Sequence, residues 1–175
     1  MSDRSDQPHT APHPAVSASA SVSVRPYRDD DWAGISRVHD AARLHELRAS
    51  VGEDAFLTLA QTYAGEGLFD GAVWVAEADD GAVAGFAALA DSELTWLYVD
   101  PAHYRRGVGR ALLRHALAAD DGECVECTVL DGNDAARALY ESEGFAVVET
   151  KTGRLAGNEA FQATGHIMVW RRPLP

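Results

Sequence analysis

Cysteines and long apolar runs are the two features this sequence has least of. Its 175 residues contain two cysteines, too few for a disulfide framework, and both fall in a run with strand character. Cys124 and Cys127 are three residues apart, so on a strand their side chains would point to opposite faces and would not share a metal ion. We expect two buried thiols in a reducing compartment and no metal site.

Positive charge is also scarce. The chain has 15 Lys and Arg against 27 Asp and Glu, a formal charge of -12, which disfavours attraction to nucleic acid or to an anionic membrane. No apolar run approaches the ~20 residues of a membrane span, and residues 15–24 alternate serine with small residues, unlike a signal peptide. These absences predict a cytoplasmic protein, with acidic surface that would tolerate an amine.

The first residues differ from the rest in composition. Residues 1–21 are rich in Ser, Ala, Pro, Asp and His and cannot bury an apolar face, which predicts a disordered tail. Residues 22–175 have the length of one ordinary domain.

A short basic loop lies between a strand and a helix. Residues 93–99 alternate as a strand, Asp100-Pro101 ends it, and residues 111–117 have helical apolar spacing. Between them lie three arginines and the glycines Gly107 and Gly109, which would leave the first N–H groups of the helix open to an anion. A Walker A loop and a dinucleotide fingerprint are both excluded, the second because Leu112 replaces its third glycine. The alternative is an ordinary glycine-rich turn with solvated arginines.

Periodicity and turn residues give an α/β element order around this loop. Three strands of an antiparallel meander precede it, and an Asp-Gly turn joins the first two. The expected strands are 22–27, 72–77, 82–89, 93–99, 125–130, 145–151 and 166–171, and the expected helices are 32 to about 42, 53–64, 108–119 and 133–145. A long loop over 152–165 should join the last two strands.

Two motifs in this order resemble those of the GNAT superfamily of acyl-CoA-dependent N-acyltransferases. The loop is similar to Gln/Arg-x-x-Gly-x-Gly/Ala, with Tyr104 standing where the family usually has Gln or Arg. The segment 133–145 matches Asn-x-x-Ala-x-x-Leu-Tyr-x-x-x-Gly-Phe. The resemblance implies a mixed, mostly antiparallel sheet of about six to seven strands with about four helices, in which strands four and five splay apart.

The resemblance also implies how acetyl-CoA, as co-substrate, would bind. The pantetheine arm would pair with the edge of the fourth strand, the pyrophosphate would meet the loop amides, and Asn133 would hydrogen-bond the arm or cap its helix. The implied cofactor-binding residues are Leu97, Tyr98, Val99, Tyr104, Arg105, Arg106, Gly107, Val108, Gly109, Arg110 and Asn133.

Acyl transfer to an amine needs a base, because a free amine with a pKa of about 10 is mostly protonated at neutral pH. By resemblance Glu93 is the candidate base, and strand alternation places it on the face of Thr95, Leu97 and Val99. An ordered water is the alternative base. Tyr140 holds the family's general-acid position, with core packing as the alternative role. The resemblance also implies the N–H of Val99 as oxyanion donor.

The acceptor is expected to be a primary amine of a small molecule or peptide. Its site should come from the first helices, residues 58–69 and residues 152–165, although each residue that could line it is more often a packing or surface residue. Those residues are His39, His45, Glu53, Trp74, Trp96 and Glu126. A non-catalytic acyl-CoA-binding regulatory module and a nucleotide-binding protein are the rival functions. The sequence leaves a homodimer open.

Overall fold

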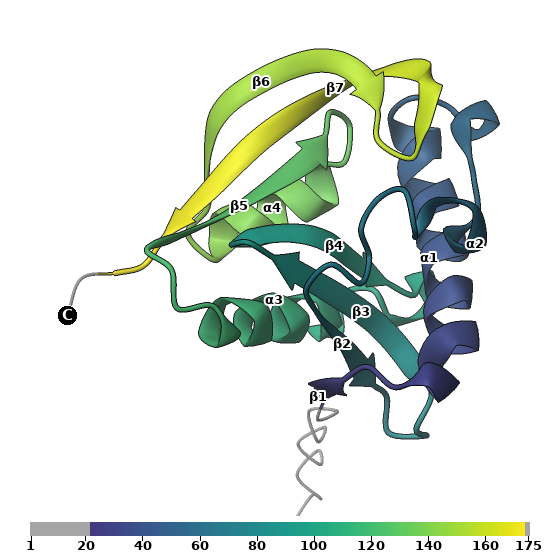
Figure 1. Ribbon diagram of the computed structural model, residues 1–175, viewed down its shortest axis with the longest axis vertical. Helices are drawn as coiled ribbons and strands as arrows, with labels where there is room; N and C mark the ends of the chain where they lie inside the picture. The colour runs from purple at the N-terminus through teal and green to yellow at the C-terminus, as the bar shows by residue number, and fades with distance from the viewer. Residues whose placement is uncertain (1–21, 174–175) are drawn as a thin grey trace, which may run out of the picture.

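The computed structural model describes residues 22–173, which form one seven-stranded mixed sheet. Its strand order is β1-β2-β3-β4-β5-β7-β6, and β4–β5 is its parallel pair (Figure 1). This confirms the α/β fold expected from the sequence. The strands are β1 (Ser23–Pro26), β2 (Ala72–Glu77), β3 (Val83–Ala90), β4 (Glu93–Val99), β5 (Cys124–Leu130), β6 (Ala146–Leu155) and β7 (Asn158–Arg171). The expected tail, residues 1–21, lies outside the described residues.

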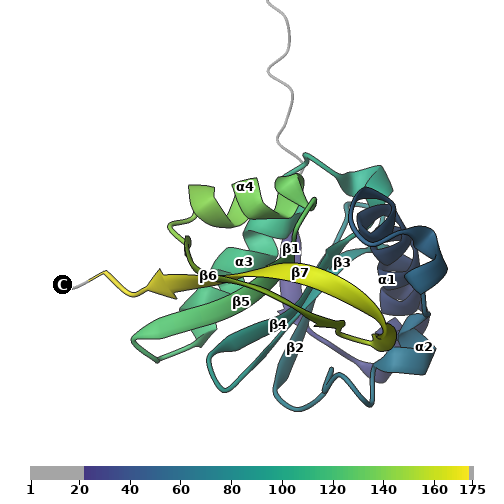
Figure 2. The same cartoon turned by 90° about the horizontal axis from the view of Figure 1, so that it is seen from above.

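Helices cover both faces of the sheet (Figure 2). On one face, α3 (Val108–Ala119) packs Leu112 and Leu113 into the larger core cluster, with α4 (Asp134–Ser142) beside it. On the other face, α1 (Trp32–Ala49) and the short α2 (Leu59–Thr62) pack against Phe86 and Trp96. Three 3-10 turns complete the chain: η1 (Asp29–Asp31), η2 (Glu53–Ala55) and η3 (Pro101–His103).

The meander forms as its turn residues predict. The β3–β4 turn consists of Asp91 and Ser92, with φ of 48° and 60°, and two residues with positive φ match the twist of the flanking strands. Gly81, with φ of 79°, lies in the β2–β3 turn. β4, over Glu93–Val99, confirms the predicted strand, and its far end lies directly before the basic loop.

The first helix is longer than its predicted end near Ala42. It continues to Ala49 and buries Leu47 completely, because the residues after Ala42 include good helix formers. The predicted helix over 53–64 is wrong for most of its length. Only η2 and α2 form there, with extended backbone at Phe56 between them.

The predicted loop over residues 152–165 is also wrong. β6 and β7 continue through this region as a long hairpin that turns at Gly157, where φ is 80°. β6 is exposed almost throughout, so pairing with β7 rather than burial holds it. In both views the hairpin turn lies beside α1 and α2 (Figures 1 and 2), and a Cβ on Gly157 would lie 3.3 Å from a methyl carbon of Thr62.

Within residues 22–173, none of the helices is both long enough and apolar enough to cross a membrane.

Candidate active site

The fourth and fifth strands separate almost as soon as they meet. Glu93 and Glu126 form the one register pair between β4 and β5 in the described chain, next to a hydrogen bond of 2.9 Å from Glu126 N to Ser92 O. Further along β4, the backbone edge of residues 97–99 that faces β5 has no strand partner. An open edge of this kind can pair with the amides of an extended ligand arm.

The basic loop leads into the N-terminus of α3, where the first N–H groups have no partner within the helix. Arg105 and Gly107 have φ of 60° and 84°, and the first helical hydrogen bond runs from Ala111 N to Gly107 O. The N–H groups of residues 108–110 precede that bond, so they are free to meet an anion. A Cβ on Gly107 would meet no atom within 4 Å, which leaves room for a ligand beside the backbone. The loop therefore fits a diphosphate.

The loop side chains divide into two groups. Arg105 and Arg106 are exposed and can add positive charge for a phosphate. Arg110 already has partners at the C-terminal end of α4, with Nε 3.2 Å from Glu143 Oε1 and Nη2 3.1 Å from Ser142 Oγ. Tyr104 lies edge-on to the ring of His45 on α1, with centroids 5.6 Å apart.

Asn133 sits where β5 leads into α4, and both ends of its amide are bonded. Its Oδ1 caps the helix by accepting from Ala136 N at 3.2 Å, and its Nδ2 donates to Glu46 Oε1 at 2.9 Å. Glu46 also pairs with Arg43 at 2.7 Å and lies 3.5 Å from the hydroxyl of Tyr98. Glu46 thus links Asn133, which follows β5, to Tyr98 of β4 across the gap between the two strands.

A β-bulge makes the predicted face of Glu93 wrong. Ala88 pairs with Trp96 and Leu89 with Leu94, so Thr95 is an extra residue that reverses the alternation. Leu94, together with Leu97 and Val99, therefore packs toward α3, whereas Trp96 and Tyr98 pack toward α1.

By alternation Glu93, adjacent to Leu94, lies on the α1 side of the sheet. It is exposed there, opposite Glu126 of the neighbouring strand.

Tyr140 lies on α4 with its ring against Phe145, at a centroid distance of 5.3 Å, and is 6% exposed. Burial, followed by the proximity of Cys127, Glu46 and Tyr98, raises its pKa well above the ordinary value for a phenol. Its hydroxyl therefore stays protonated at neutral and moderately alkaline pH, as a proton donor must.

Both cysteines are free, but the prediction of two buried thiols is wrong for Cys124, which is half-buried because it lies at the first position of β5. Cys127 is buried, and burial with the nearby charges of Glu126 and Glu93 raises its pKa to about 12. A thiol with such a pKa is a poor nucleophile at neutral pH.

Several residues considered for acceptor binding have packing roles. His39 of α1 and Trp96 of β4 are buried against each other between the helix and the sheet. Trp74 packs on the opposite face against His115 of α3. Glu53 forms an exposed ion pair with Arg48. His45, beside Tyr104, and Glu126, beside Glu93, are the exposed residues of that set that lie next to predicted site residues.

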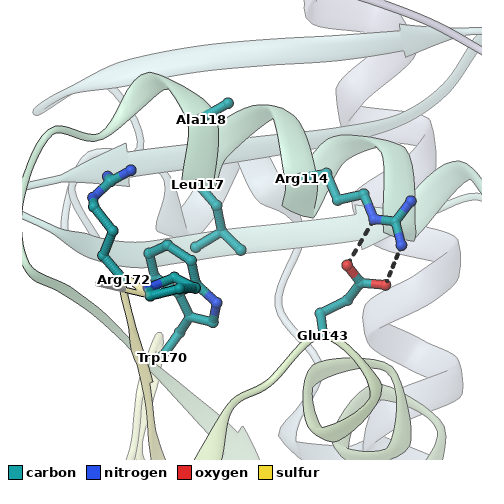
Figure 3. A pocket seen from close by; sticks show the side chains of 7 residues that line it. Arg114, Leu117, Ala118, Glu143, Trp170 and Arg172 are labelled. Atoms are coloured by element: carbon teal, nitrogen blue, oxygen red, sulfur yellow. Dashed lines mark hydrogen bonds and ion pairs between the residues drawn. The ribbon is translucent and has the colours of Figure 1, made fainter. Parts of the chain in front are cut away.

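A pocket of about 530 Å³ lies elsewhere, between the second half of α3 and the end of β7 (Figure 3). There Arg172 lies over the ring of Trp170 at 5.5 Å, and Arg114 binds Glu143 through two hydrogen bonds of 2.7 and 3.0 Å. None of the predicted site residues lines this pocket, so it is separate from the loop and the splayed strands.

Sequence reasoning missed Arg43 and Glu46. On a helix they continue the buried spacing of Val38, His39 and Ala42, and charged residues on a buried face are a functional signal. The signal was lost because the helix was expected to end near Ala42.

Comparison with known proteins identifies a domain family to which the middle of the chain is similar. Residues 69–147 match the family described as the acetyltransferase (GNAT) domain, which covers β2 to the start of β6 and so includes the loop, Asn133 and Tyr140. This stretch of the chain is therefore similar to the GNAT acetyltransferase domain.

Particular relatives extend the match. The chain is 34% identical to a mycothiol acetyltransferase of Propionibacterium freudenreichii, over 85% of this chain and 49% of that protein. It is 35% identical to the N-alpha-acetyltransferase RimI of Mycobacterium tuberculosis, over 50% of this chain and 62% of that protein. The chain thus spans about half the length of the first of these relatives and under two thirds of the second.

A solved structure has the same fold. YncA from Salmonella typhimurium, determined with its cofactor acetyl-CoA, has a TM-score of 0.64 and 24% identity, covering 89% of this chain and 98% of that one.

Proposed function

We propose that this protein is an N-acetyltransferase that moves the acetyl group of acetyl-CoA directly to a primary amine bound at the same time. The observation that carries the proposal is the open edge of β4, which leads to the free N–H groups at the start of α3 and whose Tyr98 lies near the buried Tyr140. The family match supports it. A non-catalytic module would bind acetyl-CoA without needing the buried Tyr140.

The residues divide the work of binding. Backbone groups of residues 97–99 would pair with the pantetheine arm, and residues 105–110 would hold the pyrophosphate with Tyr104 beside them. Asn133 would bond the arm with the Nδ2 hydrogen that Glu46 does not use. When bound, acetyl-CoA supplies a thioester-activated acetyl group.

Two side chains would move protons. Glu93 would remove a proton from the acceptor amine, directly or through a water; its position on the α1 side, opposite Glu126, supports this because paired carboxylates attract an ammonium group. Tyr140 would donate its proton to the departing thiolate. The N–H of Val99 would stabilise the developing oxyanion.

Two observations support a class of acceptor: the net negative charge of this protein and the names of its relatives. Relatives named mycothiol acetyltransferase and N-alpha-acetyltransferase suggest mycothiol-related amines and peptide N-termini as the first candidates. We propose that the amine approaches from the α1 side, near the hairpin turn, and that the protein works in the cytoplasm.

The test is a screen of mycothiol-related amines, peptide N-termini, amino acids, polyamines and aminoglycosides with acetyl-CoA, in which acetylated product is detected by mass. We expect amine-dependent turnover with at least one class. Tight CoA binding with no turnover on any amine would instead favour a regulatory module, and competition by ATP rather than by CoA would favour a nucleotide-binding protein.

A further inference from the structure

Glu46 is the point at which three separate parts of the chain meet. It lies on α1, accepts from Arg43 on the same helix at 2.7 Å and from Asn133 past β5 at 2.9 Å, and lies 3.5 Å from the hydroxyl of Tyr98 on β4. Tyr98 is on β4 and Asn133 follows β5, so they lie on opposite sides of the gap between these two strands. One carboxylate therefore spans the region in which a ligand arm would run.

The carboxylate is itself held in place. The side chains of Arg43 and Glu46 are each only 14% exposed, and Arg43 Nη2 donates to Ala156 O in the hairpin turn at 3.1 Å. A shielded, charge-assisted pair with a second anchor loses little freedom, so its geometry is well defined. Glu46 thus has a fixed position rather than that of a mobile surface side chain.

The bond from Asn133 to Glu46 also fixes the orientation of the Asn133 amide group. Because Oδ1 accepts from Ala136 N and one Nδ2 hydrogen goes to Glu46, the amide plane cannot flip without losing both bonds. The second Nδ2 hydrogen therefore points in a single direction, in which it can donate to a ligand. An isolated asparagine would adopt several orientations, and some would present its oxygen to a ligand amide oxygen.

We propose that Glu46 is a positioning residue of the acyl transfer, which acts through Asn133 by holding the Asn133 amide in the orientation that receives the CoA arm. The proposal rests on the proposed function for the identity of the ligand. The Arg43–Glu46 pair in turn connects this orientation to α1 and to the hairpin turn, the two segments expected to bind the acceptor.

The test is a double-mutant cycle with CoA itself as the probe. Glu46→Gln keeps the shape but loses the charge, Glu46→Ala removes the group, and Asn133→Ala removes the residue through which it acts. Through Asn133 the carboxylate controls one hydrogen bond between neutral amide groups, so we expect Glu46→Ala to raise the Kd for CoA roughly twofold to tenfold. Asn133→Ala should do the same, and the double variant should be no weaker than Asn133→Ala alone.

The control is Glu141→Gln, which removes an exposed α4 carboxylate that pairs with Arg137 and should leave the Kd unchanged. Additive losses in the double variant would overturn the proposal, as would unchanged affinity in all Glu46 variants. If Glu46→Ala does not fold, Glu46→Gln carries the same cycle. Because CoA binding is measured without an amine, the result stands apart from the amine screen, whose failure alone would count against the proposed activity.

Discussion

At the scale of single residues, Tyr140 and Cys127 lie close together but have opposite chemical uses. Burial raises the pKa of both groups. For a phenol the consequence is a proton kept available to a leaving group, whereas for a thiol it is the loss of the nucleophilic thiolate. The same apolar surroundings therefore favour direct transfer over a covalent acyl-cysteine step.

Tyr140→Phe removes the hydroxyl and leaves the ring against Phe145. We expect kcat to fall by about 10²-fold, the lower range for general acid catalysis, while the Kd for CoA changes less than about twofold. Steady-state kinetics and calorimetry measure the two quantities. Equal losses in both would mean that the ring is structural.

The thiol of Cys127 should resist alkylation by iodoacetamide at pH 8, because its pKa of about 12 leaves almost no thiolate. Peptide mass mapping after labelling checks this, with the half-buried Cys124 as internal comparison. Cys127→Ala should retain most of the activity. Rapid labelling of Cys127, or loss of activity in that variant, would reopen a nucleophilic role.

At the scale of elements, sequence patterns located those segments whose stability is local or follows burial. The strand over 93–99 was predicted because a turn bounds it at one end and Asp100-Pro101 at the other, and the loop glycines were predicted because α3 begins there. The bulge at Thr95 was missed, since an extra residue depends on the register with β3, which one strand's sequence does not contain. The extension of β6 and β7 through residues 152–165 was missed because their exposed residues show no apolar alternation.

The role of the basic loop can be tested by comparing its Gly107 with a matched glycine outside it, Gly81 of the β2–β3 turn. Gly107 and Gly81 have φ of 84° and 79°, and a Cβ on either would meet nothing within 4 Å. Alanine at either position should cost about 1–2 kcal/mol of stability through left-handed strain. Only Gly107→Ala should also weaken CoA binding, because its methyl group would enter the phosphate region. Thermal unfolding and calorimetry separate the two effects, and equal affinity in both variants would remove the loop as the phosphate site.

At the scale of the whole molecule, two buried aspartates join distant parts of the chain. Asp31 binds Arg25 through two bonds of 2.8 Å, and Arg25 also binds Glu77. Asp100 pairs with Arg37 of α1 and caps η3 through Ala102 N. The Arg25 bonds lower the pKa of Asp31 against the effect of burial. Burial would raise the pKa of Asp100, but the Ala102 N–H and Arg37 outweigh it and lower that pKa as well.

These shifts fix the direction of the acid response. A carboxyl whose folded pKa is below its unfolded value of about 3.9 stabilises the fold fully above that value, and its contribution is lost as the pH falls through the folded pKa. Asp31→Asn and Asp100→Asn should each lower stability at pH 7 by about 1–3 kcal/mol and flatten the decline below about pH 4. Urea unfolding at pH 7, 5 and 3 measures this, and an unchanged acid decline would contradict it.

The hairpin turn has a consequence for biosynthesis. Arg43 binds Ala156 O, and Asn158 Nδ2 binds Ala55 O at 3.0 Å, so helical residues near the start of the domain are joined to a hairpin turn that lies 113 and 103 residues later in the chain. The hairpin must therefore be translated and leave the ribosome before these contacts can form. Until then a nascent chain can assemble its meander and helix α3, while α1 still lacks its contacts with the hairpin turn.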